Sequence, residues 1–457
     1  MSIRFDDSLP ILCKVIDDEL GADVLGGGAT LRDAAGRLAF FAGSPLDGET
    51  NDRVSAVLRE QLGEYARTDR VLAGADDFGA SRVLEDPNAL CLSVGEHRIR
   101  LVDRRMVGAD WLRTPAEASG PPPRLVFASL KGGVGRSTAL AVAAADLASR
   151  GLRVLAVDLD LEAPGLGPML LEDDTLPAFG TLDALVENGI SGLDERFLAD
   201  LIGPSGLAGG LGRIDVMPAF GRQSLVNAGE ILAKLSRAYT EDVRAEGGVA
   251  TFRDQVAELL QRFSDPDRYD AILIDARAGL HESTAAAVLG LGAEVLLFGL
   301  DEPQTFQGFR ALLAHLARFV DPDAAAAPEW LARLTVVQGK ATSAESRRAF
   351  AERCRDLVEE MGLGPRPPRP HAGALVPAEP FNDPEWDETL PDDAVLQSED
   401  WGLGEPVAIA DDGNYRGFDP LRRGDLLAEG LYRATFGTFL GHIHSAVPSA
   451  REAGHED

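Results

Sequence analysis

The sequence predicts an α/β fold in which a mostly parallel sheet is flanked by helices, preceded by a small α/β unit at the N-terminus. Three observations carry this prediction. After residue 124, short apolar runs alternate with segments of helical periodicity, as a right-handed parallel sheet requires. Hydrophobic residues make up 45% of the 457-residue chain and aromatic residues only 6%, which indicates Ala-, Leu- and Val-rich helices packed on a sheet. A Pro-rich stretch, residues 119–123, separates the two parts.

Residues 1–118 are expected to form the small unit. Its predicted elements are a strand at residues 38–41, a helix at residues 51–67 capped by Asn51 or Asp52, and strands at residues 90–94 and 99–102 around a turn at Gly95-Glu96. No cluster of catalytic side chains stands out here, so we expect a docking or dimerisation module. The consecutive prolines of residues 119–123 favour extended backbone and predict a stiff linker.

Residues 124–445 are expected to form one parallel-sheet domain. The predicted strands are residues 125–128, 154–158, 214–217, 271–275, 294–299 and 334–337, and the predicted helices are residues 137–150, 226–263, 303–319 and 344–361. The stretch 364–417 is rich in Pro and Asp, so we expect either a long functional loop or a partly mobile segment. A last helix at about 420–443 precedes a polar tail, residues 446–457.

Charge and cysteine content exclude several function classes. The formal net charge is −30, a field that repels nucleic acid and favours protein and small-molecule partners. The three cysteines are far apart in the sequence and form no CxxC pair, which argues against a zinc site, an iron–sulfur site or a disulfide framework. The start of the chain lacks a signal-peptide core, and no apolar run approaches the ~20 residues that cross a bilayer. We therefore expect a cytoplasmic protein that does not contact a membrane.

The strongest motif is a strand, a Gly-rich turn and a helix within residues 125–141. The turn reads Lys131-Gly132-Gly133-Val134-Gly135-Arg136-Ser137-Thr138, and it fits G-x-x-x-x-G-[KR]-[ST] loosely because Leu130 fills the first glycine position. Glycines let successive backbone N–H groups converge on phosphate oxygens, and the following helix N-terminus adds its positive dipole. Residues 132–138 are thus predicted to bind a nucleotide, with the Ser137 hydroxyl on Mg²⁺.

This turn resembles the deviant phosphate loop, KGGVG[KR][ST], of the MinD/ParA group of P-loop NTPases. The resemblance covers about residues 124–445. In that family the early lysine, here Lys131, reaches across a nucleotide-sandwich dimer to the phosphates of the other subunit. The resemblance therefore implies ATP and Mg²⁺ as ligands, a homodimer in the ATP state and a catalytic contribution from Lys131.

Arg136 departs from the family pattern, which usually has lysine at this position, and places the chain in a KGGVGR-type variant group. The chain has 40 Arg and only 4 Lys, so coding bias is one explanation of the change. Arginine remains cationic and can contact phosphate oxygens bidentately, but it is bulkier and planar. We expect Arg136 to bind the nucleotide and to take part in catalysis, with hydrolysis depending on an adapted loop.

The strand at residues 154–158 ends in two carboxylates, Asp158 and Asp160. It resembles the first switch segment of the family, where the later aspartate positions the attacking water. By that resemblance Asp160 is the catalytic candidate and Asp158 supports the Mg²⁺ shell. The alternative is that both carboxylates only cap the strand in solvent.

The run Tyr269–Asp275 has the Walker B form, an apolar strand that ends in aspartate. Asp275 is predicted to hold Mg²⁺ through a water molecule. Where the family has its second switch segment, Gly279 is expected to bring a backbone N–H near the γ-phosphate. Arg277 and His281 are equally compatible with a functional and a structural role.

Weaker resemblances suggest residues around the base. Gln338 follows a predicted strand where the family often has an adenine-reading Asn, and Asn382 with Asp383 resembles a late Pro-x-Asp loop beside the base. These three residues are predicted to bind the nucleotide, and ordinary loop positions are the alternative.

The resemblance implies an ATP-dependent molecular switch that hydrolyses ATP slowly and that dimerises or engages a protein partner in the ATP state. The net charge and the acidic end, residues 450–457, argue against DNA-binding and membrane-targeted relatives. A hydrolysis-deficient nucleotide-binding scaffold is an alternative that Arg136 keeps open. A bacterial tyrosine kinase is a weaker alternative, because only Tyr415 and Tyr432 lie late in the chain. A role in a bacterial defence system is compatible with such a variant, although no residue indicates it, and the sequence names no partner.

Overall fold

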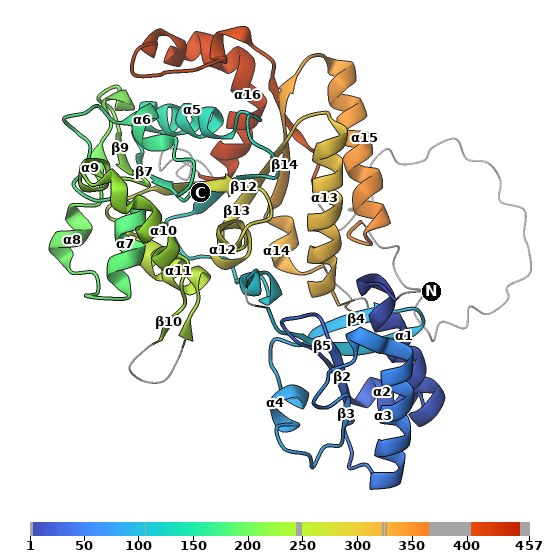
Figure 1. Cartoon of the computed structure of the whole chain (residues 1–457). Coiled ribbons are helices and arrows are strands. Elements are labelled where there is room, and N and C mark those ends of the chain that lie inside the picture. The colour runs from blue at the N-terminus through green and yellow to red at the C-terminus, as the bar shows by residue number, and fades with distance from the viewer. Residues whose placement is uncertain are drawn as a thin grey trace, which may run out of the picture.

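Figure 1 shows the chain as a computed structural model, which describes residues 3–105, 107–243, 249–321, 324, 327–364 and 404–447. One sheet lies in the N-terminal unit and a larger sheet lies in the rest of the chain. In Figure 1 the N-terminal unit lies below the larger domain. This arrangement confirms the predicted α/β fold with a small N-terminal unit.

The larger sheet is mostly parallel. In spatial order its strands are β15 (Val407–Ala410), β14 (Leu334–Ala341), β13 (Glu294–Gly299), β6 (Arg124–Ser129), β12 (Ala271–Ala278), β7 (Arg153–Asp158), β9 (Arg213–Met217) and the antiparallel β8 (Gly203–Pro204). All the strands predicted for this part are present. β15 was not predicted, because a strand of four residues does not stand out from the Pro- and Asp-rich stretch around it. β12 pairs with both β6 and β7, so the carboxyl ends of these three strands are adjacent.

Helices cover both faces of this sheet. Along β6, Leu125 and Phe127 pack in one core and Val126 and Ala128 in the other, because successive side chains of a strand point to opposite faces. The first core includes α5 (Arg136–Ser149), α6 (Leu166–Leu170) and α16 (Glu429–Ala446). The second includes α7 (Thr181–Asn188), α8 (Glu195–Ala199), α11 (Phe252–Gln261), α12 (Glu282–Gly290), α13 (Pro303–Leu316), α14 (Glu329–Ala332) and α15 (Ala344–Glu360). In the part of the chain that the structure describes, no helix is long and apolar enough to cross a membrane.

The single helix predicted for residues 226–263 is wrong. The structure divides this stretch into α9 (Arg222–Val226), α10 (Ile231–Ala238), the strands β10 (Asp242–Val243) and β11 (Val249–Ala250), and α11. Thr251 caps α11, and the Asp254 carboxylate accepts the Thr251 N–H at 3.1 Å. This reciprocal cap starts a new helix. The last helix begins at Glu429 and not near residue 420, after the 3₁₀ turn η7 (Gly424–Leu427).

The N-terminal unit is built on a mixed sheet. Its order is β3 (Leu72–Ala73), β2 (Leu38–Phe41), β1 (Ala29–Arg32), β5 (His97–Asp103) and β4 (Leu90–Val94), with α1 (Phe5–Leu20), α2 (Ala22–Gly27), α3 (Gly48–Leu62) and α4 (Ser81–Leu84) around it. The predicted strands are confirmed, and α1, α2, α4, β1 and β3 were not predicted. The predicted helix is α3, but Asp47 caps it by accepting the Thr50 N–H at 2.9 Å. A cap at Asn51 or Asp52 is therefore wrong, since both lie inside the helix.

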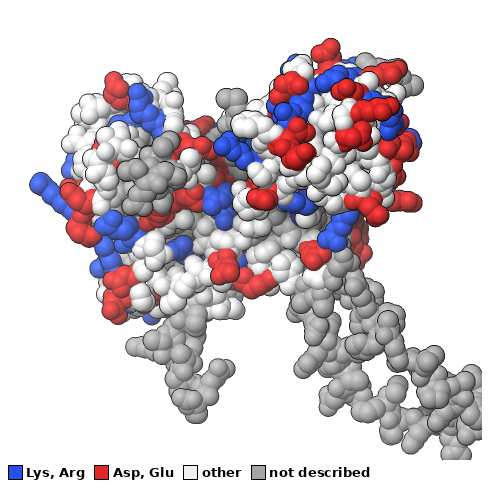
Figure 2. Space-filling model, turned by 90° about the horizontal axis from the view of Figure 1, so that it is seen from below, with Lys and Arg blue, Asp and Glu red and all other residues white. Residues whose placement is uncertain are grey.

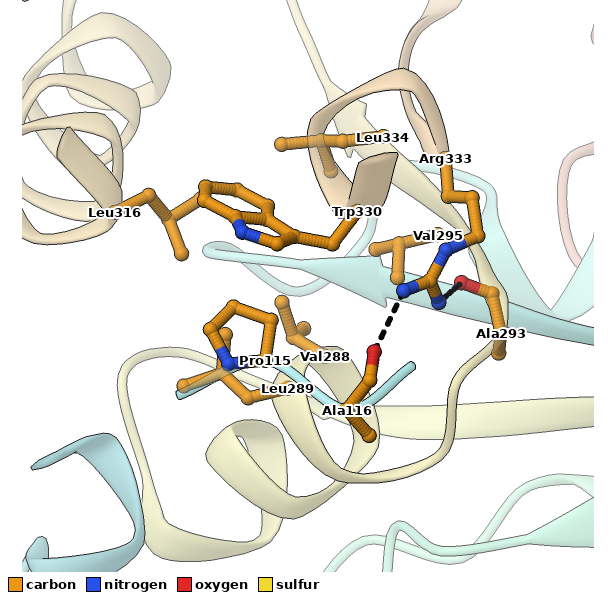
Figure 3. Close-up of a pocket in the computed structure, with 10 residues that line it drawn as sticks. All are labelled: Pro115, Ala116, Val288, Leu289, Ala293, Val295, Leu316, Trp330, Arg333 and Leu334. Atoms are coloured by element: carbon orange, nitrogen blue, oxygen red, sulfur yellow. Dashed lines mark hydrogen bonds between the residues drawn. The ribbon is translucent and has the colours of Figure 1, made fainter. Parts of the chain in front are cut away.

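The chain segment before the prolines is anchored to the larger domain. The Ala116 N–H donates to the Leu289 carbonyl at 2.7 Å, and Arg333 donates to the carbonyls of Ala116 at 2.6 Å and Ala293 at 3.3 Å. Figure 3 shows the Arg333 guanidinium bonded to these two carbonyls, together with Pro115 and Trp330, which line the same small cavity. The connection is thus packed from residue 115 onward, ahead of the stiff linker expected at residues 119–123. The domain limits 1–118, 124–445 and 446–457 stay predictions.

A second contact joins the connection to helix α12. The Glu282 carboxylate accepts the N–H groups of Gly108, which precedes the 3₁₀ turn η2 (Ala109–Leu112), and of Asp110 within that turn, at 2.7 Å. The Asp110 carboxylate in turn accepts the Arg253 N–H at the start of α11, at 2.8 Å. These bonds link the N-terminal unit to the helix that follows the predicted second switch segment.

Candidate functional site

The predicted phosphate loop is a tight turn between β6 and α5. Gly133 and Gly135 have positive φ angles of 77° and 94°, a conformation that favours glycine, and Gly135 precedes the first helical residue, Arg136. A helix N-terminus directly after a Gly-rich turn presents unpaired backbone N–H groups and a positive dipole to an anion. The structure thus brings residues 132–138 together at one helix end.

Arg136 lies inside the domain, at the ends of three strands. Its Nε donates to Asp275 Oδ1 at 2.5 Å, and its two Nη atoms donate to Asp160 Oδ2 at 3.1 Å and Ser129 Oγ at 3.2 Å. Its side chain is 9% exposed. Burial acts to lower the pKa of Arg136, but the carboxylates of Asp275 and Asp160 outweigh it and raise the pKa. In this structure the cation of the loop neutralises two buried carboxylates.

Ser137 and Asp275 form an oxygen pair at the first turn of α5. The Ser137 hydroxyl donates to Asp275 Oδ2 at 2.6 Å, and Asp275 is almost fully buried. Burial raises the pKa of Asp275, while Arg136 and the Ser137 hydroxyl act in the opposite direction. A hydroxyl and a carboxylate are the hard oxygen donors that Mg²⁺ prefers. The donor set therefore fits Mg²⁺ at this position.

Asp158 uses both carboxylate oxygens to shape the loop after β7. It accepts the N–H groups of Asp160 at 3.0 Å, Gly165 at 3.1 Å and Leu166 at 3.0 Å. Burial and the nearby Asp275 carboxylate raise the pKa of Asp158, against the effect of these three donors. Asp158 is fully buried. The structure thus shows a positioning role for Asp158, and its role in a Mg²⁺ shell stays a prediction.

Two ion pairs connect the segments around the loop. Arg277, near the end of β12, pairs with Glu162, after β7, so the two predicted switch segments are tied together. Lys131 pairs with Glu302, the residue that precedes α13. Gly279 has a φ angle of 96°, and its N–H donates to the Ser129 carbonyl at 2.9 Å. That N–H is therefore engaged in this structure, and its contact with a γ-phosphate stays a prediction.

His281 has a structural role in this arrangement. Its Nδ1 accepts the Ser283 N–H at 3.3 Å and so caps α12. Burial, followed by the Arg277 charge, lowers the pKa of His281. A neutral ring with Nδ1 as acceptor is consistent with a helix cap.

A cavity of about 330 Å³ adjoins the loop. Its walls are the loop residues Gly133–Gly135 and Thr138, Gly339 and Lys340 of β14, the end of β15 with Asp411 and Asp412, residues 415–417, and Thr435 and Phe436 of α16. The predicted base contact Gln338 does not line it: Gln338 is buried, and its Nε2 donates to Ser346 Oγ at 3.1 Å. Asn382 and Asp383 lie outside the described residues.

Most residues of this cavity were not predicted from the sequence. The residues after β15 were assigned to a stretch without periodicity, and α16 comes from almost 300 positions beyond the loop. One available signal was Lys340, since the chain has only 4 Lys. Lys340 has a φ angle of 53°, and its Nζ donates to the Gly133 carbonyl at 2.6 Å. Strained backbone of this kind is concentrated at functional sites.

Replacing Lys340 by alanine is expected to lower the free energy of unfolding by about 1 kcal/mol, because the bond to Gly133 is lost. Lys340→Gly loses the same bond but adopts a positive φ without strain, so it should be the more stable of the two variants by about 1 kcal/mol. Urea unfolding of both variants measures the difference. An alanine variant as stable as the glycine variant would contradict the strain at this position.

Comparison with known proteins agrees with this geometry. The family CbiA, described as the CobQ/CobB/MinD/ParA nucleotide binding domain, matches residues 125–263. A search of curated proteins gives no match. Among solved structures, the cell division ATPase MinD of Pyrococcus furiosus is 18% identical, with 71% of this chain and 99% of that chain covered and a TM-score of 0.40.

Two further solved structures are similarly remote. The pNOB8 ParA bound to nonspecific DNA is 17% identical, with 73% of this chain and 99% of that chain covered and a TM-score of 0.38. A plasmid partition protein of Borrelia burgdorferi B31, bound to AMPPNP, is 18% identical, with coverage of 53% and 89% and a TM-score of 0.33. At these values the structural likenesses carry no argument about function.

The family match spans the Gly-rich loop, α5 and β7 with its following carboxylate Asp160, and it ends before β12, the strand that carries Asp275. Residues 125–263 therefore resemble the CobQ/CobB/MinD/ParA nucleotide binding domain, and this match supports a P-loop domain of the MinD/ParA type in this part of the chain.

Proposed function

We propose that this chain is a molecular switch that binds ATP, hydrolyses it slowly, and dimerises or engages a protein partner in the ATP-bound state. The observation that carries the proposal is the Ser137–Asp275 oxygen pair, 2.6 Å apart, at the N-terminus of the helix that follows the Gly-rich turn. Phosphates on the backbone N–H groups of residues 132–138 would lie beside this pair. Mg²⁺ on the pair would neutralise part of the phosphate charge.

The cavity of about 330 Å³ is the proposed place of the nucleoside. It begins at the loop and is large enough for a base and a ribose, since small-molecule sites start at about 300 Å³. The Tyr415 and Phe436 rings, whose centroids are 4.9 Å apart, supply an aromatic wall. Contacts of Gln338, Asn382 and Asp383 with the base stay predictions.

Arg136 is proposed to exchange partners when ATP binds. Without nucleotide its guanidinium neutralises Asp160 and Asp275. Phosphate oxygens would compete for that guanidinium, because bidentate arginine–phosphate contacts are strong. Release of Asp160 would then leave its carboxylate available to orient the attacking water. In the proposal, binding and readiness for hydrolysis are thus coupled through one side chain.

Lys131 is proposed to act in the contact between subunits. Replacing Lys131 by alanine is expected to abolish ATP-induced dimerisation and to keep most of the ATP affinity, because the loop backbone and Arg136 serve the subunit's own nucleotide. Glu302→Gln frees Lys131 and should shift the dimer midpoint to lower ATP concentration by up to about fivefold, since a partly exposed ion pair is worth at most about 1 kcal/mol. Light scattering with a non-hydrolysable ATP analogue measures both variants.

A matched control removes a lysine elsewhere. Lys14 lies on α1, is 75% exposed and pairs only with Asp18 one turn away, so Lys14→Ala should dimerise like the wild type. Dimerisation that persists in Lys131→Ala would refute the proposed bridging role.

The scaffold alternative rests on the same Arg136 network, because a catalytic carboxylate held by Arg136 cannot orient water. ATP turnover in the presence of Mg²⁺ separates the two: measurable release of phosphate supports the switch, and tight ATP binding with no turnover supports the scaffold. Absence of ATP binding by calorimetry would remove both.

The tyrosine-kinase alternative loses support from the described tyrosines near the end of the chain. Tyr432 is 2% exposed and donates to Asp146 at 2.8 Å, and the Tyr415 hydroxyl donates to the Leu426 carbonyl at 2.9 Å. Both hydroxyl groups are therefore engaged inside the domain. We propose protein partners at a cytoplasmic location for this chain, in keeping with its charge of −30 and with acidic and basic side chains interspersed on the face seen in Figure 2.

A further inference from the structure

A second cleft, of about 1030 Å³, lies between the N-terminal unit and the larger domain. One wall comes from α1, Arg32 and residues 87–95, which include the edge strand β4. The opposite wall comes from the end of α13, the 3₁₀ turn η5 (Ala317–Phe319) and the end of α15. Its volume is at the upper end of small-molecule sites, about 300–1,000 Å³. No residue of this cleft lines the proposed nucleotide site.

Each wall contributes an arginine without a direct counter-ion. Arg32 ends β1, and Arg318 lies in η5. Among the described residues, neither side chain has a hydrogen-bond or ion-pair partner, and Nε of Arg32 is buried without a partner. The Arg32 guanidinium lies 4.4 Å from the Phe5 ring centroid. Arg318 is exposed to solvent at the opposite wall. Guanidinium groups that line a cleft without a protein partner are suited to bind an oxyanion.

Carboxylates offset these two charges only in part. The Asp103 carboxylate acts to raise the pKa of both Arg32 and Arg318, and Asp6 acts in the same direction on Arg32, but burial and neighbouring guanidinium groups leave the pKa of both arginines lowered. Asp103 also accepts two hydrogen bonds from Arg105, at 2.8 and 3.0 Å. The chain has a net charge of −30, so acidic residues are abundant. The absence of an ion-pair partner for these two arginines is therefore not due to a shortage of carboxylates. A bound anion would remove the repulsion among the arginines.

The lining also has apolar side chains on both walls, together with polar side chains and the carboxylates of Asp6 and Asp321. Leu9 and Leu92 on one side and Phe319 and Val320 on the other are in the lining. An ion pair between Arg98 and Asp321, 3.0 Å long, joins the two walls. A ligand in this cleft would therefore meet positive charge and apolar surface together.

We propose that the cleft binds a small amphipathic anion, whose carboxylate or phosphate group contacts Arg32 and Arg318 and whose apolar part packs against Leu9, Leu92 and Phe319. The charged group gives orientation through bidentate bonds, and burial of the apolar part supplies about 25 cal/mol for each Å² removed from water. The inference is independent of the proposed nucleotide function, because the two sites share no residue.

The test uses a fluorescent probe of matching chemistry on the full chain. Anilinonaphthalene sulfonate combines an aromatic body with an anionic group, and phenylnaphthylamine is its neutral analogue. We expect saturable sulfonate binding at one site and at least tenfold weaker binding of the neutral analogue. Octanoate and octyl phosphate then compete for the probe, and the stronger competitor identifies the preferred anionic group.

Arg32→Ala and Arg318→Ala should each weaken sulfonate binding at least tenfold, with a thermal unfolding midpoint near that of the wild type. Arg318→Lys should retain part of the affinity. Arg422→Ala removes the same charge from an 88% exposed side chain and serves as the matched control, with unchanged binding.

Either of two results overturns the proposal. One is equal affinity of the wild type for the charged and the neutral probe. This comparison uses no variant, so it tests the proposal even if Arg32→Ala does not fold. The other is displacement of the probe by ATP with unchanged binding in the arginine variants, which would place the probe in the nucleotide site.

Discussion

Replacing Arg136 by alanine is expected to lower the free energy of unfolding of the nucleotide-free protein by about 3–5 kcal/mol, the usual loss when one partner of a buried ion pair is removed. The reason is that Asp160 and Asp275 would both stay buried without their shared cation. Urea unfolding without nucleotide measures the change. ATP affinity should fall by at least roughly tenfold, about 1.4 kcal/mol, because the loop also loses its cation for the phosphates.

Two further measurements make this prediction specific. Arg136→Lys keeps the charge but loses the fork that contacts three side chains, so its stability should lie between the wild type and Arg136→Ala. Mg²⁺ alone should raise the unfolding midpoint of Arg136→Ala more than that of the wild type, because it supplies a cation next to Asp275. An alanine variant as stable as the wild type would show that the carboxylates do not depend on Arg136.

Replacing Asp160 by alanine is expected to reduce ATP turnover by about 10²–10⁴-fold, the range typical of a lost general base or water-orienting group. Its carboxylate lies at the end of β7, where the Ala163 N–H and Arg136 hold it at 3.3 and 3.1 Å. ATP affinity should change little, so the ATP-bound dimer should persist. Phosphate release and light scattering after a single addition of ATP measure the two effects.

Asp160→Asn serves as the control for shape, because the amide keeps the size of the side chain and one acceptor oxygen. We expect it to be as inactive as Asp160→Ala while retaining more of the stability. Turnover at the wild-type rate in both variants would assign the water-orienting role to another residue, with Glu162 as the next carboxylate on the same loop.

The sequence by itself determined the framework of this protein. The strands β6, β7 and β12 were predicted because each is a buried run of apolar residues that ends at a carboxylate or a Gly-rich turn. The loop between β6 and α5 was predictable because its glycines, the following helix and the hydroxyl of Ser137 are neighbours in the chain. These features depend on residues that are neighbours in the sequence, so they can be predicted without knowing the tertiary structure.

The N-terminal unit and the C-terminal part of the domain were less predictable. Helix α1 shows apolar residues at helical spacing, Leu9, Leu12 and Ile16, but Pro10 lies inside it, and proline is a signal against a helix interior. β15 is too short to have a period of its own, and only its pairing with β14 makes it a strand. Their structure depends on neighbours that the local sequence does not contain.

Only the tertiary structure decided what the individual side chains of the site contact. Arg136 was expected to face phosphates, yet it meets Asp275, 139 positions away, because parallel pairing places β12 beside β6. Asp158 accepts hydrogen bonds from the backbone of the loop that follows it, and β14, two strands away from β6 in the sheet, brings Lys340 to Gly133, 207 positions away. The cleft between Arg32 and Arg318 likewise exists only where two separately folded sheets meet. Contacts between residues that are distant in the sequence follow from how sheets and helices pack, and a pattern of residues along the chain does not predict them.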